Sequence, residues 1–222
     1  LNNNLELEDF YENSFTGLQN LKVIDVSNIA RLCDIKTPME VLDKLPNLEQ
    51  FINNNNDELY FSLCDLDKCV NLILIDTFSS IILTEPHTFN NLVNLEILRY
   101  DGPEFFDRQT FKNLVNLQEL YVREFCIHQF NQGIDPDVFN DNINLRKISL
   151  TKTNFKSIDE QTFKNQEKLE YLNLYNNYFE SIPDNLFSNQ KCLKYINLRL
   201  SNNLKEIPKA VKKVITLETI LF

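Results

Sequence analysis

Apolar residues recur along the chain in short units that read Leu-x-x-Leu-x-Leu. The first residues of successive units are separated by 27, 24, 23, 22, 28, 24, 24 and 24 residues. The fourth and sixth positions alternate with polar neighbours, which is the pattern of a strand with one buried face. We therefore predict one short strand in each unit. The first residues of the units are Leu21, Leu48, Leu72, Leu95, Leu117, Leu145, Leu169, Leu193 and Leu217.

A second apolar column supports the same register. It lies six residues before each of those leucines: Phe15, Leu42, Leu66, Phe89, Phe111, Phe139, Phe163, Phe187 and Val211. A strand this short cannot bury its apolar side alone, so each unit must be covered by the next, and stacked units build one continuous core. We expect parallel strands about 4.8 Å apart, with this column along the outer wall.

The clearest unit runs from Leu169 through Asn177 to Pro183. Its residues resemble the leucine-rich repeat family, and within it the 24-residue class with the consensus LxxLxLxxNxLxxIPxxxFxxLxx. The resemblance covers residues 1–222, which we expect to form a single array. It implies an α/β solenoid curved like a horseshoe, with a parallel sheet on the concave face. Irregular segments, 3-10 turns and short helices are expected on the convex face.

The array is expected to hold about eight full repeats, with partial repeats at both ends and no caps, as an internal segment of a longer protein would. A short helix is predicted over residues 39–45, and the insertion over residues 131–137 is predicted to bulge outward as a turn-rich loop. The family's asparagine at position nine is kept only at Asn56 and Asn177. We expect Ser80, Thr153 and Ser201 to substitute for it, and Ile29, Pro103 and Phe125 to interrupt the ladder.

Composition adds two features to this picture. Asparagine reaches 31 residues, which we attribute to codon bias in an AT-rich genome. The net charge is −10 and is unevenly distributed, with 9 Lys+Arg against 24 Asp+Glu in residues 1–145 and 13 against 7 in residues 146–213. Either the two halves are solvated differently, or the charge steers a polarised partner. The bulk acidity argues against a nucleic-acid partner, because such proteins present a concentrated basic face.

No catalytic, cofactor or metal site is predicted. The three glycines build no phosphate-binding loop, and the cysteines and histidines lack the spacing of metal ligands. Cys126 and His128 flank the core residue Ile127 and are expected to point outward without a pocket. Asp65 and Asp67 flank the core residue Leu66 and are expected to be solvated. No apolar run approaches the ~20 residues of a membrane helix.

The compartment is left open by the five cysteines. Cys64 can pair with Cys69 or with Cys33, or the thiols stay reduced as small buried hydrophobes. The chain has no Asn-x-Ser/Thr sequon, which disfavours a heavily glycosylated ectodomain. The family resemblance nevertheless favours an extracellular or cell-surface protein, with a cytoplasmic location as the alternative.

The repeat register places positions two, three, five, seven and eight on the concave face. Tyrosine and arginine dominate interface hot spots, and both gather at these positions in the later repeats. We therefore predict a non-catalytic module that binds a protein with an acidic surface. The alternative is that exposed strand positions simply favour tyrosine and that the cations keep the sheet soluble. The predicted binding residues are Arg99, Tyr121, Arg123, Lys147, Lys152, Tyr171, Tyr175, Tyr195 and Arg199.

The earlier repeats place Leu74 and Phe78 on the same face, as a second contact area or as a surface covered by an adjoining segment. The resemblance implies a receptor of the innate-immune or cell-surface type. Two alternatives stay open, an intracellular scaffold or adaptor and the substrate-recognition part of a larger enzyme. A dimer or a hetero-complex is compatible with each of them.

Overall fold

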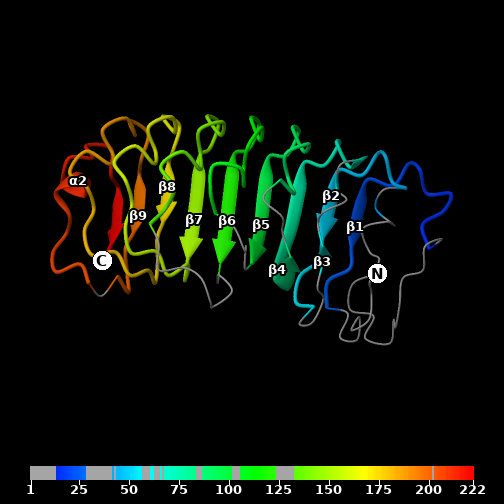
Figure 1. The fold of residues 1–222 in the computed structure, drawn as a ribbon, viewed down its shortest axis with the longest axis horizontal. Helices are drawn as coiled ribbons and strands as arrows, with labels where there is room; N and C mark the ends of the chain where they lie inside the picture. Colours follow the sequence, from blue (N-terminus) through cyan, green and yellow to red (C-terminus); the bar gives the residue numbers. More distant parts are fainter. Residues whose placement is uncertain are drawn as a thin grey trace.

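Short parallel strands stacked side by side make the body of the molecule (Figure 1). The computed structural model describes residues 14–28, 42, 44–56, 61–62, 66, 68–83, 87–101, 106–123, 133–201 and 203–222. Nine of its strands form one sheet in chain order, so each turn of the solenoid adds one strand. These strands are β1 (Val23–Asp25), β2 (Gln50–Ile52), β4 (Leu74–Leu83), β5 (Ile97–Asp101), β6 (Glu119–Arg123), β7 (Lys147–Thr151), β8 (Tyr171–Asn173), β9 (Tyr195–Asn197) and β10 (Thr219–Leu221).

The strand register confirms the leucine intervals at every step. Val23 pairs with Gln50 across β1 and β2, and Tyr195 pairs with Thr219 across β9 and β10. Both pairs join third positions, two residues after the first leucine of each unit. The units of 22 and 28 residues keep this register, so the length variation lies outside the strands. The complete column of third positions is Val23, Gln50, Leu74, Ile97, Glu119, Lys147, Tyr171, Tyr195 and Thr219.

β4 departs from the pattern because it continues beyond the usual end of the strand. Its register with β5 shifts between Thr77 and Ile81, and β3 (Phe61–Ser62) pairs with its far end. The described return segments are mostly turns, with one short helix, α2 (Lys209–Lys212), near the end of the chain. The helix predicted over residues 39–45 lies largely outside the described residues.

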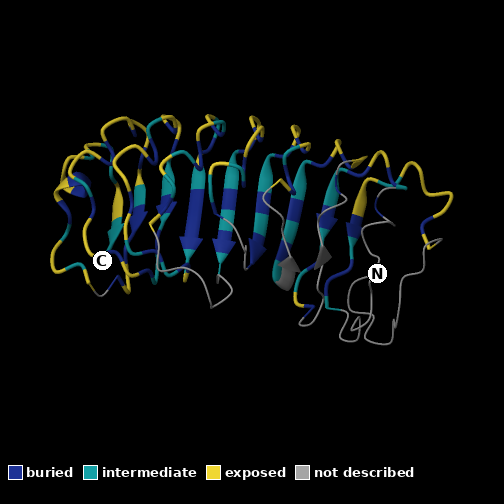
Figure 2. Cartoon of the chain, viewed as in Figure 1, coloured by how far each residue is buried: buried dark blue, intermediate teal, exposed yellow. Residues whose placement is uncertain are grey.

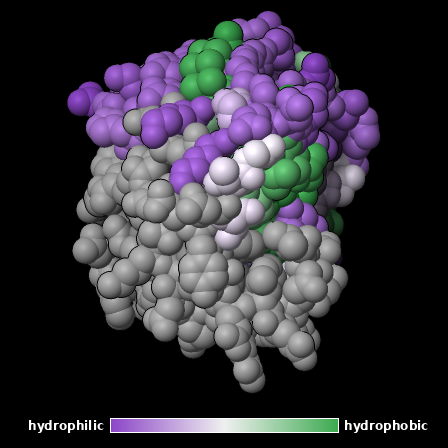
Figure 3. Space-filling view, turned by 90° about the vertical axis from the view of Figure 1, so that its right-hand side faces the viewer, coloured by the Kyte–Doolittle hydropathy of each residue, from purple (hydrophilic) through white to green (hydrophobic). Residues whose placement is uncertain are grey.

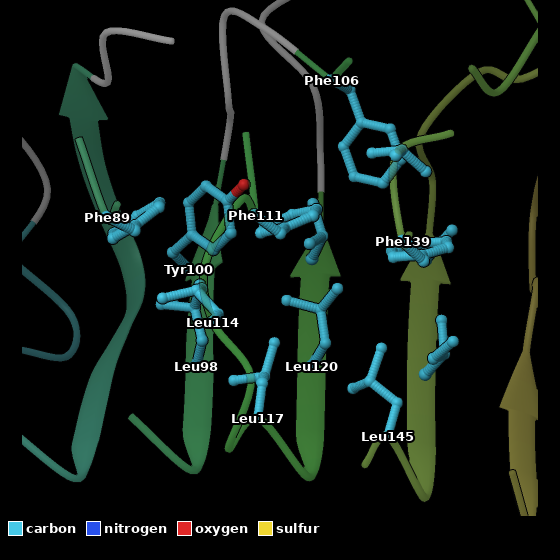
Figure 4. Close-up of a cluster of buried hydrophobic side chains, with 14 of the residues drawn as sticks. Phe89, Leu98, Tyr100, Phe106, Phe111, Leu114, Leu117, Leu120, Phe139 and Leu145 are labelled. Carbon is cyan, nitrogen blue, oxygen red and sulfur yellow. The ribbon is translucent and has the colours of Figure 1, made fainter. Parts of the chain in front are cut away.

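The core holds both predicted apolar columns. The seven first-position leucines from Leu48 to Leu193 are fully buried, and Leu21 and Leu217 at the two ends pack against the cluster. All nine members of the second column are buried, which confirms the outer wall. The rings of Phe111 and Phe139 stack nearly parallel with centroids 6.0 Å apart (Figure 4), and those of Phe139 and Phe163 do the same at 5.9 Å. Truncating such a phenylalanine to alanine is expected to cost about 3–5 kcal/mol.

Exposure follows the two edges of the sheet. The loops along the upper edge in Figure 2 are exposed, whereas most of the strand interior is buried. The view onto the β1 end in Figure 3 shows apolar surface among polar described residues, and Leu18 and Val23 are exposed there. Most of the large apolar side chains that are exposed therefore lie outside the strands.

A row of asparagines connects neighbouring repeats along the upper edge. We call Asn20, Asn47, Asn71, Asn94, Asn116 and Asn144, each immediately before a first-position leucine, the asparagine row. From Asn47 to Asn144, each side-chain Nδ2 donates to a backbone carbonyl of the preceding repeat at 2.7–3.0 Å. These five bonds satisfy carbonyls that the strand ladder leaves unpaired, so Asn47, Asn71, Asn94, Asn116 and Asn144 have a structural role.

A second amide column lies inside the outer wall. Asn142, Gln166 and Gln190 are buried, and their amide nitrogens donate to the carbonyls of Phe111, Phe139 and Phe163. These bonds connect one return segment to the next in the C-terminal half. They satisfy backbone groups that would otherwise be buried without a partner.

The position-nine ladder is formed in part. Asn177 donates to the carbonyls of Leu150 and Leu174, and its Oδ1 accepts from the Thr153 hydroxyl at 2.7 Å. Thr153 therefore substitutes as predicted. Ser201 does not, because its buried hydroxyl has no hydrogen-bond partner in the described part of the chain. Ile29, Pro103 and Phe125 lie outside the described residues, as does the side chain of Ser80.

Position eight has a conformation that the leucine pattern does not reveal. Six of these residues adopt left-handed backbone, with φ between 56° and 60°. This single residue turns the chain out of the strand. Asparagine tolerates the conformation better than most residues with a side chain, and it fills three of the six positions. The six residues are Asn28, Asn55, Ser79, Lys152, Asn176 and Leu200.

The insertion over residues 131–137 does not bulge outward in its described part, which corrects that prediction. Ile134 is buried and forms a parallel bridge with Ile158 of the next repeat. Gly133 approaches Ser157 so closely that an added Cβ would lie 2.3 Å from the Ser157 hydroxyl. The segment therefore joins the stack because an apolar residue inside it completes the core.

Candidate binding surface on the sheet face

The side of the sheet predicted to be concave carries the third, fifth and seventh positions of each unit, and we call it the sheet face. Strand alternation places them there. In β6 and β8, for example, half-buried residues alternate with buried ones. The predicted binding residues at these positions therefore do project from the sheet. Lys152, at position eight, is exposed beside them.

A group of charges in the middle of the sheet face is already neutralised within the chain. We call Asp76, Arg99, Glu119, Tyr121 and Lys147 the central network. Glu119 accepts from Lys147 Nζ at 2.7 Å and from the Tyr121 hydroxyl at 3.0 Å. Arg99 lies 3.1 Å from Asp76 Oδ2 and 3.7 Å from Glu119 Oε2, and its guanidinium stacks over the Tyr121 ring.

The ionisation of two members of the central network reflects these contacts. Burial opposes ionisation of Glu119, but hydrogen bonds from Lys147 and Tyr121, together with the charges of Lys147 and Arg99, outweigh it and lower the pKa of the carboxyl. Burial and the hydrogen bond to Glu119 raise the pKa of Tyr121 to about 12. The network therefore holds an ionised carboxylate and a neutral phenol at physiological pH.

Arg123, at position seven of its repeat, is also neutralised within the chain. Arg123 Nη2 lies 2.7 Å from Asp101 Oδ2, and the same nitrogen donates to the Ser79 hydroxyl at 2.9 Å. The Arg123 guanidinium also covers the Phe78 ring, 5.1 Å from its centroid. The sequence left open whether an adjoining segment covers Phe78, and the structure shows that Arg123 of β6, two strands away from β4, covers its ring.

The C-terminal part of the sheet face is different. Tyr171 and Tyr195 stack with ring centroids 4.4 Å apart and an interplanar angle of 7°. Burial and the neighbouring Tyr195 raise the pKa of Tyr171 to about 12. Asn173 and Asn197 hold the next backbone segment, because their Oδ1 atoms accept from the amides of Tyr175 and Arg199. We call Tyr171, Tyr175, Tyr195 and Arg199 the tyrosine platform.

Arg199 is the cation of this region that the fold leaves available. Its side chain is exposed, and it makes no ion pair with any carboxylate in the described part of the chain. The structure thus divides the predicted site. Arg99, Tyr121, Arg123 and Lys147 are engaged in intramolecular contacts, whereas the tyrosine platform presents aromatic surface and one unneutralised guanidinium.

The structure describes only part of the remaining candidate chemistry. Cys126, His128, Asp65, Asp67, Cys33 and Cys64 lie outside the described residues. Cys69 is buried, with Sγ 3.6 Å from the Leu42 carbonyl oxygen, and Cys192 is an exposed free thiol. The described residues contain no group of three His, Cys, Asp or Glu side chains that could hold a metal ion. They also contain no helix long and apolar enough to cross a membrane.

Comparison with known proteins agrees with this geometry. Residues 143–204, which include the tyrosine platform, match the family described as leucine rich repeat. A leucine-rich repeat protein of Leptospira interrogans superimposes with a TM-score of 0.70 and 19% identity, covering 92% of this chain and 50% of that protein. The structure of the TLR13–ssRNA13 complex superimposes with a TM-score of 0.54 and 21% identity, covering 98% and 38%. No curated protein sequence matches the chain.

The stacked parallel strands, the leucine register and the family match together define a solenoid of repeats. Residues 143–204 match the leucine-rich repeat family, and the described chain has the leucine-rich repeat fold. It spans half the length of the Leptospira protein and 38% of the TLR13 chain. At these identities the superpositions show the fold, and assignment to the 24-residue class stays a prediction.

The acidic members of the central network were missed at the sequence level, although the register contains the signal. Asp76 and Arg99 occupy fifth positions of adjacent repeats, and Glu119 and Lys147 occupy adjacent third positions. Side chains directly opposite on neighbouring strands lie within contact distance. Opposite charges in one column of adjacent repeats therefore indicate an ion pair from the register alone.

Proposed function

We propose that this chain is a non-catalytic recognition module that binds a protein partner through the tyrosine platform. The supporting observation is the stacked pair Tyr171–Tyr195 together with the unneutralised Arg199 on the same face of the second of these repeats. Tyrosine and arginine offer large contact areas at low ordering cost, and both are enriched at interface hot spots. Leucine-rich repeat proteins use such sheet surfaces mainly for recognition rather than for catalysis.

The partner surface is acidic in this proposal. Residues 146–213 carry 13 Lys+Arg against 7 Asp+Glu, so the half of the chain around the platform is basic. Exposed Lys152 adds to the charge of Arg199 on this side of the sheet. A basic surface attracts an acidic protein during its diffusional approach and disfavours a basic one.

The proposal also includes the type of protein and its cellular location. The TLR13 structure is that of a receptor complex with ssRNA13, and its likeness favours the innate-immune or cell-surface type with an extracellular location. Mapping the cysteines tests the location, because a native disulfide supports secretion and five reduced thiols support the cytoplasm. In the second case the module is an intracellular scaffold or adaptor.

Selection from a displayed peptide library tests the proposed site. Peptides selected on the wild-type protein should be rich in Asp and Glu and should lose binding to the variant Tyr175→Ala/Arg199→Ala. The matched control is Tyr178→Ala/Lys191→Ala, which removes one exposed tyrosine and one exposed cation away from the strands. Both variants should unfold near the wild-type temperature.

Three results would contradict the proposal. The first is equal loss of binding in the two variants. The second is loss of folding in Tyr175→Ala/Arg199→Ala, because the platform side chains would then belong to the core. The third is displacement of the selected peptides by single-stranded RNA, which would place a nucleic acid rather than a protein on the platform.

A further inference from the structure

A polar groove follows the upper edge of the sheet in Figure 1, at the N-terminal ends of the first five strands of the path. It has a volume of about 700 Å³. It is lined by the asparagine row from Asn20 to Asn116 and by the second-position side chains Lys22, Glu49, Ile73 and Glu96. The groove is a different surface from the tyrosine platform, which lies on β8, β9 and the residues that follow each.

The outward-facing atoms of this groove are mainly hydrogen-bond acceptors. Asn47, Asn71, Asn94 and Asn116 each use Nδ2 to bind a backbone carbonyl of the preceding repeat. Among the described residues, no donor is within hydrogen-bond distance of the Oδ1 atoms of these four asparagines. The carboxylate of Glu96 likewise makes no ion pair within the described part of the chain. A ligand for the groove must therefore supply donors.

The chain itself shows which donor the asparagine row accepts. Asn144 belongs to the same row, and Lys168 follows it at the equivalent position of the next repeat. Lys168 Nζ donates to Asn144 Oδ1 at 2.6 Å. At the other end of the row, Lys22 Nζ lies 2.6 Å from Glu49 Oε1, and both side chains line the groove at second positions. In both places a lysine ammonium group binds a side-chain oxygen at this edge of the sheet.

From these observations we propose that the groove binds a lysine-rich α-helix of a partner protein. Acceptors repeat along the groove at the strand spacing of about 4.8 Å, and successive turns of a helix repeat at about 5.4 Å, so one lysine from each turn can reach one repeat. An extended segment fits less well, because its same-side residues lie about 6.8 Å apart.

Charge complementarity supports the same occupant. Residues 1–145, which include the whole groove, hold 24 Asp+Glu against 9 Lys+Arg. This half of the chain attracts a cation-rich partner, whereas the half around the tyrosine platform attracts an anionic one. The chain then carries one surface that prefers a cationic partner and one that prefers an anionic partner. Substitutions can disrupt binding at either surface without changing the other.

The test uses a fluorescein-labelled helical peptide with one lysine per turn, titrated into the protein and followed by anisotropy. A peptide with glutamine at every lysine position is the ligand control. Glu96→Lys is the test variant, because it reverses a groove charge without removing any asparagine hydrogen bond. Glu160→Lys is the matched protein control, since it makes the same charge change at an exposed turn.

We expect the lysine peptide to bind, the glutamine peptide to bind far more weakly, and Glu96→Lys to weaken binding by about fivefold or more. Glu160→Lys should change the affinity by less than about twofold, and raising the ionic strength from about 0.02 to about 0.3 M should weaken binding. Tyr175→Ala/Arg199→Ala should bind the peptide like wild type, so failure of the platform proposal leaves this result intact.

The proposal is overturned if the two charge-reversal variants weaken binding equally, because the attraction would then be a property of net charge alone. It is also overturned if the glutamine peptide binds as well as the lysine peptide. Spermine provides a further test. If spermine displaces the peptide at an equal concentration of amines, the groove binds small polycations and not a helix.

Discussion

Arg123 on β6 donates through Nε and Nη2 to the two carboxylate oxygens of Asp101 on β5, at 3.2 and 2.7 Å. The same carboxylate accepts from the backbone amide of Ser79 at 2.7 Å. Asp101 therefore joins three consecutive repeats through one side chain. Because Ser79 is the left-handed residue of its repeat, the carboxylate also fixes the point where the chain leaves β4.

Removal of this carboxylate is predicted to destabilise the array more than removal of a solvent-exposed pair. Asp101→Ala leaves the Arg123 guanidinium and the Ser79 amide without their acceptor, and we expect a loss of about 2–3 kcal/mol. Lys22→Ala breaks the exposed Lys22–Glu49 pair and should cost less than about 1 kcal/mol. Urea unfolding of both variants measures the difference. Equal effects would show that the Asp101 contacts contribute no more than a surface pair.

Among the described residues, the sequence predicts both buried apolar columns completely. It predicts which charged side chains lie on the sheet face, but not which of them form ion pairs. A period in leucine and phenylalanine specifies which side chains stack, because each unit can bury its apolar edge only against the next. The fate of a surface cation depends instead on its neighbours across the strands. The sequence pattern predicts that Arg123 binds a partner, yet Asp101 stands beside it at position seven of the preceding repeat.

In the tyrosine platform, the sequence predicts the position of the aromatic side chains but not the charge environment of the arginine. Tyr171 and Tyr195 occupy third positions of consecutive 24-residue units, so their adjacency follows from the period. That Arg199 stays unneutralised does not follow from the period, since it depends on which groups the next turn of chain brings near. The roles of the asparagine row and of position eight required backbone coordinates, because they involve carbonyl groups and φ angles that no side-chain pattern displays.

Leu200 is the clearest mismatch between residue and backbone. It occupies position eight with φ 58°, where three equivalent residues are asparagine, and it is 49% exposed. A branched apolar side chain in this region costs about 1–2 kcal/mol relative to a relaxed backbone. Leu200→Asn is therefore expected to raise the free energy of unfolding by about 1 kcal/mol.

The reciprocal change provides the control. Asn176→Leu places leucine in the same left-handed conformation one repeat earlier and should lower stability by about the same amount. Thermal unfolding of the two single variants measures both shifts. Two shifts of the same sign would rule out the backbone explanation, because the changes differ only in direction.

Tyr100 offers a second stabilising substitution. It occupies a sixth position normally filled by an aliphatic residue, and its ring packs edge-on against Phe89 at 5.4 Å (Figure 4). Its hydroxyl has no hydrogen-bond partner among the described residues. Burial raises the pKa of this phenol far above its ordinary value. Tyr100→Phe removes the unpaired group and keeps the ring, so we expect a gain of about 1 kcal/mol by urea unfolding.

The variant Tyr100→Leu distinguishes the effect of the hydroxyl on stability from the effect of the aromatic ring. This variant also removes the unpaired group, but it loses the edge-on contact and leaves space beside Phe89, so it should be less stable than Tyr100→Phe. A loss of stability in Tyr100→Phe would mean that the hydroxyl is hydrogen-bonded in solution. The unsatisfied-phenol interpretation would then be wrong.

The pH dependence of stability is predicted to reflect the central network. Hydrogen bonds and charges from Lys147, Tyr121 and Arg99 outweigh the burial of Glu119 and hold the pKa of its carboxyl below the ordinary 4.5. A pKa that is lower in the folded state means that the unfolded chain binds the proton more readily. The stabilisation is therefore fully present above about pH 4.5 and is lost as the pH falls through the folded-state pKa. We expect Glu119→Gln to be less stable than wild type at pH 7, and the difference in urea midpoint to narrow toward pH 3. A difference that stays constant between these two pH values would show that Glu119 acts through packing rather than through its charge.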